Sequence, residues 1–162
     1  MPPPAVAKPI LLACTSLFWI SHYSYVPILP PYAEHQGASF QSIGLIVSAY
    51  RFVLLCLRLP LGTLSDRIKR HKSFVTVGLL VAFANARLAW APSTSAVATM
   101  RILSGVSASA WVAFTVLFAS YYPIGQTARA MGVITFCNGL SIITGSFLGE
   151  VHAETFGWHA PF

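Results

Sequence analysis

A chain of 162 residues that is 56% hydrophobic and only 9% charged has too few charges to cover a soluble domain, where about a quarter of residues are charged. The mean hydropathy is +0.68, and the composition therefore indicates an integral membrane protein. The net charge of +6 does not indicate nucleic-acid binding, because the positive residues are clustered and are not interleaved with exposed polar residues along a stripe.

After a short tail, residues 1–8, long apolar runs follow one another along the chain. A helix needs about 20 apolar residues to cross a bilayer. The fold class that these runs predict is an all-α integral membrane protein. We expect five transmembrane helices and the start of a sixth, at about 9–33, 41–61, 74–91, 96–121, 130–149 and, for the sixth, 157–162. Prolines at the outer end of the first run, Pro27, Pro30 and Pro31, should kink and then stop that helix.

The densest group of charges lies between the second and third predicted helices, from Gly62 to Lys72. It contains Asp66, the only aspartate, and four of the ten Lys and Arg residues. With a cytoplasmic N-terminus, the outside turns carry no Lys or Arg, and the inside segments carry Lys8, Arg67, Lys69, Arg70, Lys72 and Arg129. By the positive-inside rule, the sequence predicts a multi-pass protein of the plasma or inner membrane with its N-terminus in the cytoplasm.

Two arginines interrupt the second apolar run, and charge at membrane depth costs about 2.5 kcal/mol or more. A face of small and polar residues recurs at spacings of three and four: Gly44, Ser48, Arg51, Leu55, Arg58 and Gly62. Such a face should point at other helices or at a water-filled path. Arg58 is close enough to the loop either to snorkel or to function. Arg51 is too deep to snorkel, which favours a function or a buried partner.

The fourth run contains Arg101, and no acidic residue lies in any of the five predicted helices. Its donors must therefore meet backbone carbonyls, water, a substrate anion or a partner outside the chain, unless the side chain only reaches the outer headgroups. In the first run, His22 and Tyr25 belong to an aromatic and polar cluster. His22 could titrate near neutral pH or be satisfied by a neighbouring helix.

The fifth run places small and polar residues on one face, namely Asn138, Ser141, Gly145 and Gly149. The last two form a GxxxG pattern, which is typical of close helix packing. The three cysteines fall singly in apolar runs, without ligand spacing to histidine, so we expect no metal site and no cofactor. The helices also lack a nucleophile arrangement or paired carboxylates, and we do not expect an enzyme.

The charged loop resembles the pattern G-x-x-x-D-R-x-G-R-R/K, found between the second and third helices of major facilitator superfamily transporters. The matching residues are Gly62, Asp66, Arg67 and Arg70, with Lys69 where the family usually has glycine. Arg101 to Gly105 looks like the family's fourth-helix pattern R-x-x-x-G. Gly145 to Gly149 distantly resembles the G-P-x-x-G of the antiporter branch, with serine replacing proline, and we assign no branch.

The resemblance implies a twelve-helix fold of two six-helix halves that rock around a central site. This chain would be a partial N-terminal half, and its missing partner would be the C-terminal half. The first and fourth helices would line the cavity, while the second and fifth would face the other half. Gly62, Asp66, Arg67 and Arg70 would form a conformational gate on the cytoplasmic side.

The leading hypothesis is a secondary transporter of a small solute in a lipid bilayer, inactive alone as an N-terminal fragment. Candidate residues for substrate binding or proton coupling are Arg101, Arg51, His22, Tyr25 and Asn138, and candidates for helix packing are Gly105, Gly145 and Gly149. The arginines favour either an anionic substrate group or a proton-linked step. The alternative is a non-transporting membrane protein that assembles with partners through its Gly/Ser helix faces.

Overall fold

The computed structural model describes residues 4–68, 75–81 and 94–157, and within them every regular element is a helix. In chain order these are α1 (Pro4–Ser24), α2 (Leu29–His35), α3 (Phe40–Ile68), the helical segment 75–81, α5 (Thr94–Ser109), α6 (Trp111–Ala119) and α7 (Thr127–Phe156). The described residues contain no strand. The all-α fold expected from the apolar runs is confirmed.

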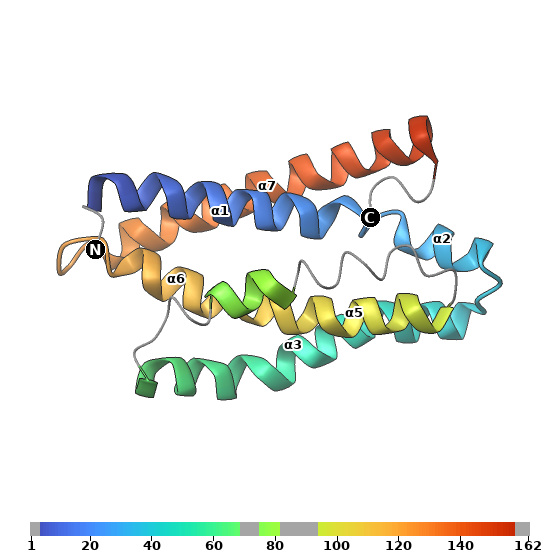
Figure 1. The fold of residues 1–162 in the computed structure, drawn as a ribbon, viewed down its shortest axis with the longest axis horizontal. Helices are drawn as coiled ribbons and strands as arrows, with labels where there is room; N and C mark the ends of the chain where they lie inside the picture. The colour runs from blue at the N-terminus through green and yellow to red at the C-terminus, as the bar shows by residue number, and fades with distance from the viewer. Residues whose placement is uncertain (1–3, 69–74, 82–93, 158–162) are drawn as a thin grey trace.

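The helices pack lengthwise into an elongated bundle (Figure 1). α1 lies against α7 and runs in the same direction, and α3 lies against α5 and also runs in the same direction as its neighbour. In the part of the chain that the structure describes, three helical stretches are long and apolar enough to cross a bilayer: Phe40–Thr63, Ser95–Ala119 and Thr127–Phe156. The last has 30 residues, or about 45 Å of helix, and therefore exceeds the roughly 30 Å hydrocarbon core.

The first predicted helix, 9–33, corresponds to two helices. α1 begins earlier, at Pro4, and ends at Ser24, and α2 begins at Leu29. Pro27 lies in the turn between them, where a missing N–H and a fixed φ oppose a continuous helix. The next two prolines occupy the first positions of α2, which tolerate proline because their N–H groups have no helical acceptor.

The ends of the other helices also differ from the apolar runs. α3 continues to Ile68, past the predicted end at 61, and α7 spans Thr127–Phe156 where 130–149 was expected. Helices can extend beyond the hydrocarbon core into the polar interface, so hydropathy alone marks only their apolar middle. The fourth predicted helix bends at Ala110, whose N–H donates to the Ser107 carbonyl at 3.1 Å. The outer part of the predicted third helix and residues 158–162 lie outside the described residues.

The fourth predicted helix, which the structure divides into α5 and α6, is the centre of the bundle. Its residues enter all three buried clusters: one with α1, α7 and segment 75–81 around Phe114 and Phe118, one in the middle around Phe18 and Ala108, and one at the α2 end around Tyr32 and Met100. The middle cluster includes Tyr50 of α3. It lies beside the polar residues described next.

Candidate functional site

Three helices bring polar side chains together in the middle of the bundle. His22 comes from α1 and Tyr25 follows its last turn, Tyr50 comes from α3, and Arg101 and Ser104 come from α5. Residues three apart lie on one face of a helix. The spacing of Arg101 and Ser104 therefore presents both to the same neighbours.

Arg101 is buried, with only 4% of its surface exposed. Its guanidinium carbon lies 4.5 Å from the centre of the Tyr50 ring and 5.9 Å from that of Tyr25. A desolvated cation over an aromatic face is attracted to it by about 2 kcal/mol. Nε and Nη1 of Arg101 nevertheless have no hydrogen-bond acceptor among the described residues. The aromatic rings hold the guanidinium in place while part of its hydrogen-bonding capacity is unused.

The hydroxyl of Tyr25 lies 2.5 Å from that of Ser104. Ser104 donates to the Met100 carbonyl at 2.8 Å, and a serine hydroxyl has a single proton. Tyr25 is therefore the donor in its bond with Ser104. The Tyr25 ring also lies beside Arg101, whose guanidinium carbon is 5.9 Å from the ring centre.

His22 is enclosed by aromatic rings and is 6% exposed. Ring centres lie between 5.3 and 6.0 Å from that of His22, and they belong to Phe18, Trp19, Tyr23, Tyr25 and Tyr50. Its Nε2 has no partner among the described residues. A buried polar nitrogen without a partner is costly, which marks His22 as a second group able to accept a ligand.

His22, Tyr50 and Arg101 line a cavity of about 110 Å³. Its lining residues are His22, Tyr23, Val26, Val47, Tyr50, Arg51 and Arg101. Val47 and Arg51 are exposed on α3, so they mark the side on which the cavity opens. The structure thus brings together three of the predicted site residues, His22, Arg51 and Arg101, with Tyr25 beside them.

Asn138 does not line this cavity. It lies on α7, partly buried, and its Nδ2 has no hydrogen-bond partner among the described residues. The polar face predicted for the second helix also lies apart from the described helices: Gly44, Ser48, Leu55 and Arg58 are exposed along α3, as is Arg51. Only Arg51 of that face reaches the cavity.

Three of the four predicted gate residues, Gly62, Asp66 and Arg67, lie toward the C-terminal end of α3. Asp66 and Arg67 belong to the last turn of α3, and Arg70 lies outside the described residues. A Cβ on Gly62 would lie 3.9 Å from Cγ1 of Val112, which is ordinary van der Waals contact. Among the described residues, no close packing requires glycine at this position.

The three packing glycines all lie where two helices approach closely. A Cβ on Gly105 would come within 2.9 Å of the Tyr50 carbonyl oxygen, and one on Gly145 within 2.6 Å of the Ile20 carbonyl oxygen. A Cβ on Gly149 would overlap the Ser24 carbonyl. Gly105 therefore allows α3 to approach α5 at Tyr50, one turn from Arg101, and so helps to build the site.

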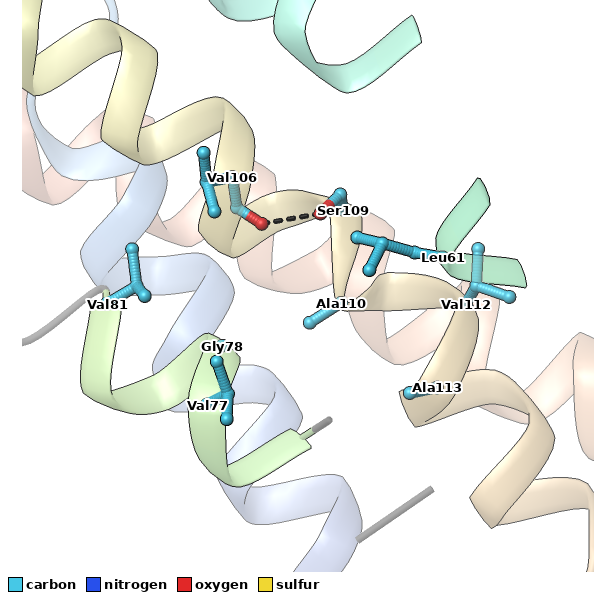
Figure 2. Close-up of a pocket in the computed structure, with 9 residues that line it drawn as sticks. All are labelled: Leu61, Val77, Gly78, Val81, Val106, Ser109, Ala110, Val112 and Ala113. Atoms are coloured by element: carbon cyan, nitrogen blue, oxygen red, sulfur yellow. Dashed lines mark hydrogen bonds between the residues drawn. The ribbon is translucent and has the colours of Figure 1, made fainter. Parts of the chain in front are cut away.

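A second cavity of about 90 Å³ lies between α3, segment 75–81, α5 and α6 (Figure 2). Its lining is aliphatic apart from Ser109, whose hydroxyl donates to the Val106 carbonyl at 2.5 Å. The cavity offers no charged group to a ligand. It is an apolar packing gap beside the bend at Ala110.

Sequence reasoning missed Tyr50 as the aromatic partner of Arg101 and Ser104 as the partner of Tyr25. Tyr50 directly precedes Arg51, about 100° away around the helix, and both side chains line the cavity. The position of the ring next to a charged residue was the available signal. Ser104 is three residues from Arg101, but the pattern alone does not show which helix meets it.

The fold and this site define a class: a helical membrane protein with a buried polar site between its helices. The family model of the Major Facilitator Superfamily matches residues 11–162. The chain belongs to this superfamily of membrane transporters, and the resemblance seen in the charged loop is confirmed.

Two relatives show the same relationship. The chain is 28% identical over 141 residues to the multi-drug resistance efflux pump PmrA of Streptococcus pneumoniae, covering 85% of this chain and 35% of that protein. It is 32% identical over 160 residues to the uncharacterized MFS-type transporter YfhI of Bacillus subtilis, covering 94% of this chain and 39% of that protein. The chain therefore spans between 35% and 39% of the length of these relatives.

Proposed function

We propose that this chain forms the N-terminal half of a secondary transporter that moves a small solute across a cell membrane by alternating access. The observation that carries the proposal is Arg101, which is buried beside a cavity with donors that have no acceptor among the described residues. An arginine at the centre of a membrane helix costs about 2.5–3.5 kcal/mol on insertion scales. A protein that only packs against partners gains nothing from this cost, whereas a transporter needs such a group for its solute.

The exposed surfaces of α3 and α7 agree with the second half of such a transporter. Large apolar side chains are exposed on both helices, including Phe52, Leu55 and Leu59 on α3, and Phe136, Ile143 and Phe147 on α7. The cavity opens on the exposed side of α3, beside Val47 and Arg51. In our proposal these two helices face the C-terminal half, and the solute site lies between the halves.

The proposed orientation places the N-terminus in the cytoplasm. Lys8 near the start of α1 and Arg129 near the start of α7 lie at the end of the bundle where α3 finishes with Asp66 and Arg67 (Figure 1). Basic residues favour the cytoplasmic side. There, Asp66, Arg67 and Arg70 would brace the gate against the C-terminal half. Solute movement, not catalysis, would be the activity, and a coupled proton is one way to drive it.

The test is solute flux in liposomes, with residues 1–162 reconstituted alone and as a fusion to the C-terminal part of the Bacillus subtilis relative. We expect the fusion to transport members of a panel of organic anions and antimicrobial drugs, and the chain alone to transport none. Arg101→Gln should abolish the flux. Arg58→Gln is the matched control, because Arg58 is exposed on α3 and does not line the cavity.

Flux from the chain alone would contradict the half-transporter proposal. Equal flux in the fusion with Arg101→Gln would contradict the role of the cavity. A fusion that inserts stably but transports nothing would favour the alternative, a non-transporting membrane protein that assembles with partners through its helix faces.

A further inference from the structure

The cavity beside Arg101 holds two polar side chains whose hydrogen-bonding atoms are unused. Nε and Nη1 of Arg101, and Nε2 of His22, have no partner among the described residues. Both residues are more than nine-tenths buried and both line the same cavity. Buried polar atoms in native proteins nearly always have partners. The pair therefore indicates a ligand that accepts hydrogen bonds.

The charged residues that line this cavity are all positive. Arg101 and Arg51 line the cavity, and none of its lining residues is acidic. The glutamates among the described residues, Glu34, Glu150 and Glu154, are exposed and do not line it. Asp66 is fifteen residues from Arg51 along α3, about 22 Å away. An anion is the ligand that would neutralise the buried guanidinium.

The cavity is small. About 110 Å³ is well below the roughly 300–1,000 Å³ of sites that enclose a whole drug-sized ligand. It can hold a carboxylate with a short substituent, but most of a larger solute would have to lie outside. Arg51 and Val47, both exposed, lie at the open side, where the remainder of the solute would project toward α3.

The lining also favours a particular geometry. The guanidinium carbon of Arg101 lies over the Tyr50 ring, and its Nε and Nη1, which have no acceptor among the described residues, are available to bind the ligand. A planar guanidinium matches the two oxygens of a carboxylate. The single buried cation matches one negative charge. The rings of His22, Tyr23 and Tyr50 with Val26 and Val47 supply the apolar and aromatic walls.

We propose that the cavity formed by His22, Tyr50 and Arg101 binds the carboxylate of a small organic acid, and that such acids are the solutes of the transporter. The statement that such acids are transported rests on the proposed function. Binding of the acid can be measured without transport. Arg101 would make the ion pair, and His22 would donate the additional hydrogen bond. Arg51 would attract the anion at the opening.

The experiment is equilibrium binding of radiolabelled benzoate to residues 1–162 in lipid nanodiscs. We expect saturable binding of benzoate, with competition by unlabelled benzoate but at least tenfold weaker competition by benzamide, its neutral counterpart of nearly the same shape. Arg101→Gln should weaken benzoate binding at least tenfold. Arg101→Lys, which keeps the positive charge, should weaken benzoate binding less. Arg58→Gln, the same change outside the cavity, should leave the affinity unchanged.

The comparison of benzoate with benzamide uses the unaltered chain, so it decides the proposal even if Arg101→Gln fails to fold. Absence of benzoate binding, equal competition by benzamide, or unchanged affinity in a folded Arg101→Gln chain would each overturn the proposal. Stronger competition by inorganic phosphate than by benzoate would also overturn it, in favour of a phosphate site. Benzoate binding that disappears in the fusion would overturn the assignment of such acids as the solutes of the transporter.

Failure of this proposal and failure of the proposed function give different results. Flux of other solutes through the fusion without benzoate binding would support the proposed transporter and contradict the proposed carboxylate site. Benzoate binding without any flux through the fusion would support the proposed carboxylate site and contradict the proposed transporter.

Discussion

At the scale of single residues, the site depends on how a buried cation is held with no acidic partner among the residues that the structure describes. The guanidinium carbon of Arg101 lies 4.5 Å from the centre of the Tyr50 ring and 5.9 Å from that of Tyr25, which is hydrogen-bonded to Ser104. Each contact is modest alone. Together they fix both the position and the orientation of the guanidinium, which is what a binding site requires.

The bond between Tyr25 and Ser104 can be measured by a double-mutant cycle. We expect Tyr25→Phe and Ser104→Ala each to destabilise the chain, with a coupling of about 1 kcal/mol, as for hydrogen bonds between membrane helices. The measurement is thermal or denaturant unfolding in detergent for both single variants and the double variant. Tyr23→Phe is the control, since its ring also lines the cavity. Strictly additive losses would show that the two hydroxyls do not stabilise each other.

At the scale of helices, backbone contacts decide which elements pair. α1 and α7 approach through Gly145 and Gly149, where the carbonyls of Ile20 and Ser24 lie in the space of a missing Cβ. Hydrocarbon lipid gives no hydrophobic force between helices, so close packing is a main source of their attraction. The α1–α7 pair therefore depends on two residues that have no side chain.

We expect Gly149→Ala to destabilise the bundle by about 1–3 kcal/mol, the usual cost of overpacking. The measurement is the unfolding temperature in detergent, together with disulfide crosslinking between cysteines introduced on α1 and α7. Gly139→Ala is the matched control, because a Cβ on that glycine, also on α7, meets nothing within 4 Å. A similar loss of stability in both variants would indicate a general effect of helix α7 and would contradict specific packing.

The sequence predicted these helices by their apolar middles, but it did not predict their ends or partners. Pro27 explains the division of the first run, whereas the bend at Ala110 has neither a proline nor a glycine at that residue to announce it. Arg101 and His22 were found because charge and imidazole are rare at membrane depth. Tyr50 was missed because an aromatic residue in an apolar run looks the same whether it faces lipid or an arginine.

At the scale of the whole molecule, the ends of the described helices gather at the two ends of the bundle, as expected for helices that cross a membrane. The start of α1, the end of α3 and the start of α7 lie together at one end of the bundle, and the turn between α2 and α3 lies at the other (Figure 1). The charges near the first end include Lys8, whose Nζ lies 4.0 Å from the Tyr122 ring centre. This contact joins the start of α1 to the turn before α7.

The orientation can be tested with single cysteines in a chain whose Cys14, Cys56 and Cys137 are replaced by serine. Ile124 and Gln41 are both exposed, near opposite ends of the bundle. In intact cells, an impermeant maleimide should label Gln41→Cys and should label Ile124→Cys only after permeabilisation, because basic residues favour the cytoplasmic side and our proposal therefore places the basic end of the bundle there. The reverse pattern would place the N-terminus outside. Labelling of both without permeabilisation would contradict a single orientation.

The arrangement around Arg101 also has a consequence for biosynthesis. Chains are made from the N-terminus, so the ribosome completes His22, Tyr25 and Tyr50 before it reaches Arg101. The aromatic rings are therefore in the membrane before the arginine arrives. When α5 leaves the translocon, α1 and α3 already offer it a polar and aromatic surface. The order of synthesis shelters the buried charge of Arg101 from lipid at the moment when it would otherwise be most exposed.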